Sequence, residues 1–390
     1  MRRAKLSQDT ERSILTYLLG AGLLFMAISN QNQPLKDVLL LSSLGQVLVI
    51  MSVLIWFKNR LGFDFGPKAL WIPLLVIALS IGISGFVHVS DMGYAEAFAQ
   101  ACWGLMLMAV YAIARKQGRK IFIPIVYGML FAVCGMVFYA FFHTGRLGST
   151  GGWISPTNYD IATGLMIFGL LVSAVEKRWW LCILAFTGVI LTGAGEGVFL
   201  GLVLAVAVIV RRDVSRRTLV ATVSLCAVLG ILVACGLFDG VFYKELDAVG
   251  IETDKADIAY KGIDGELTTD TGLNGVMHGR IDVYKESLTH IQLFGHGYTI
   301  SDFTGRTVHN VPLIIMDQVG IIAALVWLWV TAYCLLKTKW KYAFIGIIAM
   351  CVFDHYIWTQ VCCWWWALVG VASASVITND LVFKDAECAK

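Results

Sequence analysis

The chain has 390 residues, of which 58% are apolar, with a mean hydropathy of +0.74 and a formal net charge of +3. This composition excludes a soluble globular protein, because apolar runs of about 20 residues recur along the chain and each can cross a bilayer. The Lys and Arg residues are distributed beside these runs, so the small positive charge does not indicate a nucleic-acid partner.

The apolar runs predict an all-α polytopic membrane protein with about 12 transmembrane helices. The first run is long enough to stay in the membrane, so we expect no cleaved signal peptide. In chain order, the predicted spans are 13–30, 38–57, 69–88, 95–114, 121–143, 160–175, 178–193, 196–211, 218–238, 311–336, 342–358 and 361–378.

The basic residues predict the orientation of these spans. Most of the 30 Lys and Arg residues fall in alternate connections, which places both termini in the cytoplasm by the positive-inside rule. We therefore divide the chain into transmembrane helices 1–9 at 1–238, an external loop at 239–310, and helices 10–12 with a cytoplasmic tail at 311–390. All seven histidines then lie outside or at external span ends, where imidazoles can serve in acid–base chemistry.

The external connection before the sixth span contains Arg146, a Gly/Ser stretch and the polar cluster from Ser155 to Asp160. Asn158 or Asp160 can cap the sixth span by accepting backbone amide hydrogens. Alternatively, Arg146 and Asn158 face a substrate.

Residues 278–322 form the main polar segment that runs back into an apolar span. Arg280 opens a stretch with a helical spacing of apolar residues, which predicts a helix over 280–291 lying on the membrane surface. Gly295-His296-Gly297 then predicts a turn, and Arg306, His309 and Asn310 precede the next apolar run. The apolar positions of the helix are Ile281, Tyr284, Leu288 and Ile291, and its polar positions are Asp282, Lys285, Glu286 and His290.

The order of these motifs resembles the O-antigen ligase family of bacterial envelope enzymes: an Arg opening an amphipathic segment, a Gly-x-Gly turn, then His-Asn before a helix with a Gly-Ile pair, here Gly320-Ile321. The resemblance implies a GT-C-like membrane glycosyltransferase of the bacterial inner membrane, with a large periplasmic loop between helices 9 and 10. Many relatives carry an Arg at the start of the eighth span, where this chain has Glu196.

The resemblance implies transfer of a glycan from undecaprenyl pyrophosphate to a sugar hydroxyl at the periplasmic face. The pyrophosphate leaving group needs fixed positive charge, and we expect Arg280 to be catalytic, with Arg306 and Arg146 binding the substrate. The acceptor hydroxyl must lose a proton, for which His309 is the expected general base. A histidine that caps the tenth span is the alternative interpretation of His309.

The remaining predicted substrate-binding residues are Asn310, Asn158, Asp354 and His355. Asp354 is costly in lipid, so it should face the bundle interior and pair with an Arg or His, or else cap the span. No Asp-x-Asp pair occurs in the external loops, so we expect no metal and no cofactor. Cysteines are absent from the external loop, and the Cys362-Cys363 pair is expected to serve packing.

The sequence leaves the acceptor open. A ligase would transfer the glycan to lipid A-core, whereas a polymerase would join it to another lipid-linked repeat unit. A lipid-glycan flippase or transporter is a third possibility, although internal repeats are not evident. Under all three interpretations the partners are membrane lipids and a lipid-linked glycan.

Overall fold

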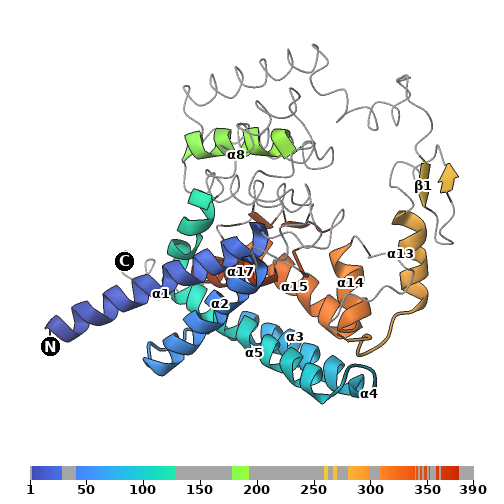
Figure 1. The fold of residues 1–390 in the computed structure, drawn as a ribbon, viewed down its shortest axis with the longest axis horizontal. Coiled ribbons are helices and arrows are strands. Elements are labelled where there is room, and N and C mark those ends of the chain that lie inside the picture. Colours follow the sequence, from blue (N-terminus) through green and yellow to red (C-terminus); the bar gives the residue numbers. More distant parts are fainter. Residues whose placement is uncertain are drawn as a thin grey trace, which may run out of the picture.

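The computed structural model shows a mostly helical chain (Figure 1). It describes residues 2–28, 41–128, 178–192, 259–261, 267–269, 280–297, 308, 310–338, 340, 343–344, 347–348, 351, 357–359 and 362–376. The elements described in these ranges are α1 (Arg2–Ile28), α2 (Leu41–Lys58), α3 (Lys68–Val87), α4 (Val89–Met92), α5 (Tyr94–Gln117), η2 (Gly118–Phe122), α8 (Trp179–Thr192), β1 (Ala259–Lys261), β2 (Leu267–Thr269), α13 (Arg280–Thr289), α14 (Val311–Gln318), α15 (Ile321–Lys337) and α17 (Cys362–Ser373).

Two described helical stretches, Lys68–Val87 and Tyr94–Gly128, are long and apolar enough to cross a membrane. The first is α3, and the second contains α5; the two helices pack side by side and are joined through α4 (Figure 1). Small residues allow this close approach, since a Cβ atom at Gly104 would lie 2.4 Å from the backbone oxygen of Ala78. The structure thus contains two helices suited to membrane association.

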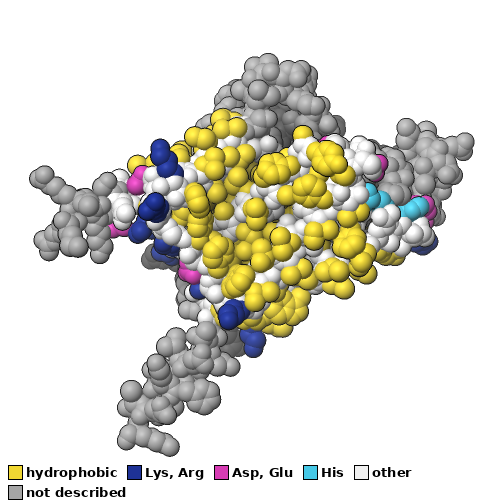
Figure 2. Space-filling model, turned by 90° about the horizontal axis from the view of Figure 1, so that it is seen from below, with side chains coloured by type: hydrophobic (Ala, Val, Ile, Leu, Met, Phe, Trp, Pro, Cys, Tyr) yellow, Lys and Arg dark blue, Asp and Glu magenta, His cyan; other side chains and the backbone are white. Residues whose placement is uncertain are grey.

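The outer surface of these helices is apolar. Large apolar side chains are exposed on α3, α5 and α15, including Leu79, Phe98 and Leu325. Figure 2 shows this apolar face, with histidines gathered at one end and most of the visible Lys and Arg side chains at the other. A broad apolar surface with polar ends is what a bilayer would cover.

Helix α17 lies in the core, and all of its residues are buried. Its run of three tryptophans suits this position, because a helix that is apolar all round is stable where water is excluded, in a protein core or within a membrane. The Nε1 of Trp364 donates to the carbonyl oxygen of Leu23 at 2.8 Å, and the Nε1 of Trp365 donates to the hydroxyl of Thr331 at 3.2 Å. These bonds join α17 to α1 and α15.

The basic end of α5 is fixed to its neighbours by polar contacts. Arg115 Nε lies 3.2 Å from Asp64 Oδ1, and Arg115 Nη1 donates to the hydroxyl of Ser373 at 3.1 Å. The ammonium group of Lys116 donates to the carbonyl oxygen of Leu61. The loop between α2 and α3 is therefore bound to the end of α5 where the Lys and Arg side chains gather.

Most predicted spans with described residues correspond to helices. The predicted spans 13–30, 38–57, 69–88, 95–114, 178–193 and 361–378 overlap α1, α2, α3, α5, α8 and α17. The predicted spans 160–175, 196–211 and 218–238 lie outside the described residues, and 121–143 and 342–358 are described only in part. The total of 12 spans stays a prediction.

The described residues are mostly helical, as the fold class predicted; β1 and β2, of three residues each, form one short antiparallel pair in the segment expected to be an external loop. One expectation needs correction. The predicted span 311–336 is not one helix, since α14 ends at Gln318 and α15 begins at Ile321. Gly320, expected inside that helix, has a φ of 101° at the break, a conformation that interrupts helical hydrogen bonding. The mean hydropathy of the run predicted a single span, because the segments on both sides of the break are apolar.

Candidate functional site

Helix α13 begins at Arg280, as the amphipathic pattern predicted, although the side chain of Arg280 lies outside the described residues. Val283 and Ser287 are buried, whereas Leu288, one of the apolar positions predicted to face the membrane, is exposed. Helix α13 contacts α14. The location of α13 on a membrane surface stays a prediction.

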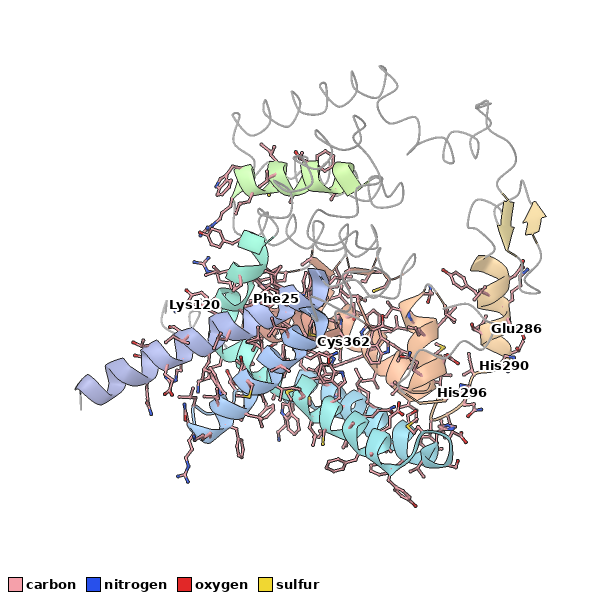
Figure 3. The ribbon with its side chains drawn as sticks, in the orientation of Figure 1. Phe25, Lys120, Glu286, His290, His296 and Cys362 are labelled. Atoms are coloured by element: carbon pink, nitrogen blue, oxygen red, sulfur yellow. The ribbon has the colours of Figure 1, made fainter. Side chains whose placement is uncertain are left out.

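One residue past the end of α13, His290 Nε2 lies 3.1 Å from Glu286 Oε1 of that helix, and both side chains are partly exposed. Figure 3 shows Glu286, His290 and His296 following one another from α13 into the next turn, on the opposite side of the view from Lys120. The chain therefore passes directly from this helix into the cluster described next.

The predicted turn at Gly295-His296-Gly297 is present, and it packs against the end of α14. Both glycines have positive φ values, 67° and 109°. A Cβ atom at Gly295 would lie 2.4–2.5 Å from backbone atoms of Gln318 and Val319, so only glycine allows this approach. The amides of His296 and Gly297 donate to the carbonyl oxygens of Asp317 and Gln318 at 2.7 and 3.0 Å. The turn thus satisfies the last carbonyl groups of α14, which have no partner within the helix.

The side chain of His296 is also bonded to Asp317. His296 Nδ1 lies 3.1 Å from both the carbonyl oxygen and Oδ1 of Asp317. Since a carbonyl and an ionised carboxylate only accept hydrogen bonds, Nδ1 carries the proton. Asp317 is buried and His296 is partly buried, and together they form an imidazole–carboxylate pair beside the break between α14 and α15.

The C-terminal end of α3 contributes two further bonds to the turn. His88 Nε2 donates to the carbonyl oxygen of Gly295 at 2.7 Å. The buried Ser84 hydroxyl donates to the carbonyl oxygen of Gln318 at 2.7 Å and accepts from the amide of Gly297 at 3.1 Å. The rings of His88 and His296 have centroids 6.0 Å apart. The first of the two membrane-compatible helices is therefore joined to both the turn and α14.

Asn310 caps α14. Its Oδ1 accepts from the amide of Leu313 at 3.1 Å, and a proline in the first turn lacks an amide hydrogen that would need a partner. This cap is a structural role for a residue that was predicted to bind substrate. Binding of a substrate by Asn310 is a separate function, and it stays a prediction.

The structure describes only two of the predicted site residues, the backbone of Arg280 and all of Asn310. The others lie outside the described residues: Arg146, Asn158, Arg306, His309, Asp354 and His355. Their assembly into one site stays a prediction. Among the residues that the structure does describe, no group of three or more His, Cys, Asp or Glu side chains could hold a metal ion.

Sequence reasoning did not select Asp317. It counted His88 only among the external histidines, and it placed His296 in the predicted turn without giving it a role. A signal for Asp317 was present, because Asp317 and Gln318 interrupt an apolar run that was predicted to cross the membrane. Nothing in the sequence indicated the contact between Ser84 and the turn, because more than 200 residues separate them in the chain.

No family model matches the chain, and no curated protein matches it. The resemblance to the O-antigen ligase family therefore depends on the order and spacing of the motifs around Arg280, Gly295, Gly297 and His309.

Proposed function

We propose that the chain is a glycosyltransferase of the O-antigen ligase type in the bacterial inner membrane. It would transfer a glycan from undecaprenyl pyrophosphate to a sugar hydroxyl of lipid A-core at the periplasmic face. The observation that carries the proposal is the packing of α13, which starts at Arg280, against α14, which is capped by Asn310, with the Gly295–Gly297 turn between them. These are the elements that carry the motifs of the family resemblance.

The charge distribution along α3 and α5 supports a cytoplasmic location of their basic ends. α3 starts at Lys68 and α5 ends with Arg115 and Lys116, whereas Asp91 and Glu96 lie near the connection between them. By the positive-inside rule, the connection and the adjoining His88 would then face the periplasm. Both termini would lie in the cytoplasm, and the segment 239–310 would be periplasmic.

In the proposed reaction Arg280 and Arg306 hold the pyrophosphate. An arginine is always ionised and binds two phosphate oxygens with its planar fork, so it stabilises the negative charge that develops as the glycosidic C–O bond breaks. The electron pair of that bond stays on the phosphate oxygen. Arg146 or Arg306 would replace the basic group that this chain lacks at Glu196.

His309 acts as the general base. It takes the proton of the acceptor hydroxyl as the hydroxyl oxygen attacks the anomeric carbon, and the attack inverts the configuration there. The remaining predicted residues would orient the two sugars by hydrogen bonds, and the reaction needs no metal or cofactor. These residues are Asn158, Asn310, Asp354 and His355.

The test uses purified chain in detergent, an undecaprenyl-pyrophosphate-linked oligosaccharide and a lipid A-core acceptor, with products identified by mass spectrometry. We expect transfer that survives a chelator and falls by roughly a hundredfold or more in His309→Ala. Transfer only to a second lipid-linked repeat unit would assign the chain as a polymerase. Inhibition by the chelator would refute the metal-independent mechanism.

A lipid-glycan flippase is the second candidate, because the break between α14 and α15 interrupts a predicted span. Discontinuous helices of this kind form substrate sites in transporters. Movement of a fluorescent lipid-linked glycan across proteoliposomes, with no glycosyl transfer, would favour the flippase.

A further inference from the structure

We propose that His296 and His88 are positioning residues for the proposed transfer: they clamp the Gly295–Gly297 turn between α3 and α14 and so fix the direction of α13. This inference depends on the proposed function for its catalytic consequence, whereas the clamp itself can be tested without it. We define the clamp as Ser84, His88, His296 and Asp317 with the turn that they hold.

The clamp joins three segments that are distant in the chain. His88 and Ser84 bind the turn from α3, and Asp317 binds it from α14. Ser84 and Asp317 are buried, where hydrogen bonds are stronger than in water and a broken bond leaves a polar group unsatisfied. The turn therefore has one favourable position relative to both helices.

Within the clamp, each histidine donates from a different ring nitrogen, and His88 Nδ1 lies 3.6 Å from Asp91 Oδ2 outside it. His296 donates from Nδ1 to Asp317, and His88 donates from Nε2 to Gly295. An asparagine amide nitrogen can occupy the place of Nδ1, and a glutamine amide nitrogen can occupy the place of Nε2. The two histidines thus require opposite conservative substitutions.

The turn controls α13 because it follows that helix after a few residues. Helix α13 has 10 residues, so its first residue lies about 13.5 Å from its last at 1.5 Å per residue. A tilt of about 5° at the turn would displace Arg280 by about 1 Å, and a displacement of this size can lower a rate by about a hundredfold. The start of α14, next to His309, would stay in place because Asn310 caps it independently.

The experiment compares four variants by their kcat, KM and amide hydrogen exchange in the peptide 293–297. We expect the kcat of His296→Asn and of His88→Gln to stay within about threefold of that of the unsubstituted protein. His296→Gln and His88→Asn should lose roughly tenfold to a hundredfold in kcat with little change in KM, and their peptide should exchange faster. His290→Gln is the matched control, because His290 pairs with Glu286 of α13 and is not part of the clamp as defined above; it should change neither kcat nor the exchange of the peptide.

Two results would overturn the clamp. If His296→Asn and His296→Gln are equally inactive while exchange is unchanged, His296 takes part in the chemistry instead. If all four variants keep full activity and slow exchange, the contacts position nothing. If the unsubstituted protein transfers no glycan, the proposed function fails, and the exchange difference between His296→Asn and His296→Gln still decides whether the clamp exists.

Discussion

Replacing Gly320 with alanine should destabilise the protein more than the same change at Gly93. Both glycines have similar backbone conformations, with φ and ψ of 101° and 166° at Gly320 and 86° and 157° at Gly93. A residue with a side chain is strained there by on the order of 1–3 kcal/mol. The surroundings differ: a Cβ at Gly93 would meet nothing within 4 Å, whereas one at Gly320 would lie 2.0 Å from the carbonyl oxygen of Leu293.

The clash at Gly320 involves backbone atoms, including the carbonyl carbon of Leu293 at 2.6 Å and the Cα of Phe294 at 2.9 Å, so no side-chain rotation relieves it. Overpacking of this kind costs about 1–3 kcal/mol in addition to the backbone strain. We therefore expect Gly320→Ala to lose about 1–3 kcal/mol more than Gly93→Ala. The displaced residues directly precede the Gly295–Gly297 turn, so the exchange of the turn's amides should also rise.

The assay is thermal unfolding in detergent, followed by the fluorescence of the 13 tryptophans at one fixed scan rate, since unfolding of such a protein need not be reversible. Gly93→Ala measures the strain alone and serves as the control. Equal thermal unfolding midpoints for Gly320→Ala and Gly93→Ala would show that Leu293 and Phe294 are not packed against Gly320. The proposed clamp would then fail as well.

Other predictions concern the site and the topology. Arg280→Lys keeps the charge and loses the planar fork, so we expect a large loss of transfer with normal membrane insertion; near-normal transfer would assign Arg280 to the helix surface. A reporter fused after Lys261 should behave as exported and one fused after Arg217 as cytoplasmic, and the reverse pattern would refute the orientation. Asn310→Ala should cost about 1 kcal/mol of stability through the lost bond to Leu313, whereas Asn310→Ser should keep the cap; a loss of transfer in the stable Ser variant would indicate a substrate contact.

The sequence alone determined the features that depend on local composition and spacing. The apolar runs predicted α3 and α5, the amphipathic spacing predicted a helix from Arg280, and the two glycines predicted the turn at His296. These features follow from hydropathy, helical period and backbone freedom, which act within a few residues.

Only the tertiary structure decided which groups meet. The break in the run 311–336 has a tertiary partner, because the amide of Ile321 donates to the carbonyl oxygen of Gln292 at 3.3 Å and Gly320 lies close to the backbone of Leu293. The bonds from Ser84 and His88 to the turn join positions more than 200 residues apart, and no periodic pattern specifies such a pairing. Long-range hydrogen bonds of this kind form only when packed helices bring their ends together, so the clamp became visible only in the folded chain.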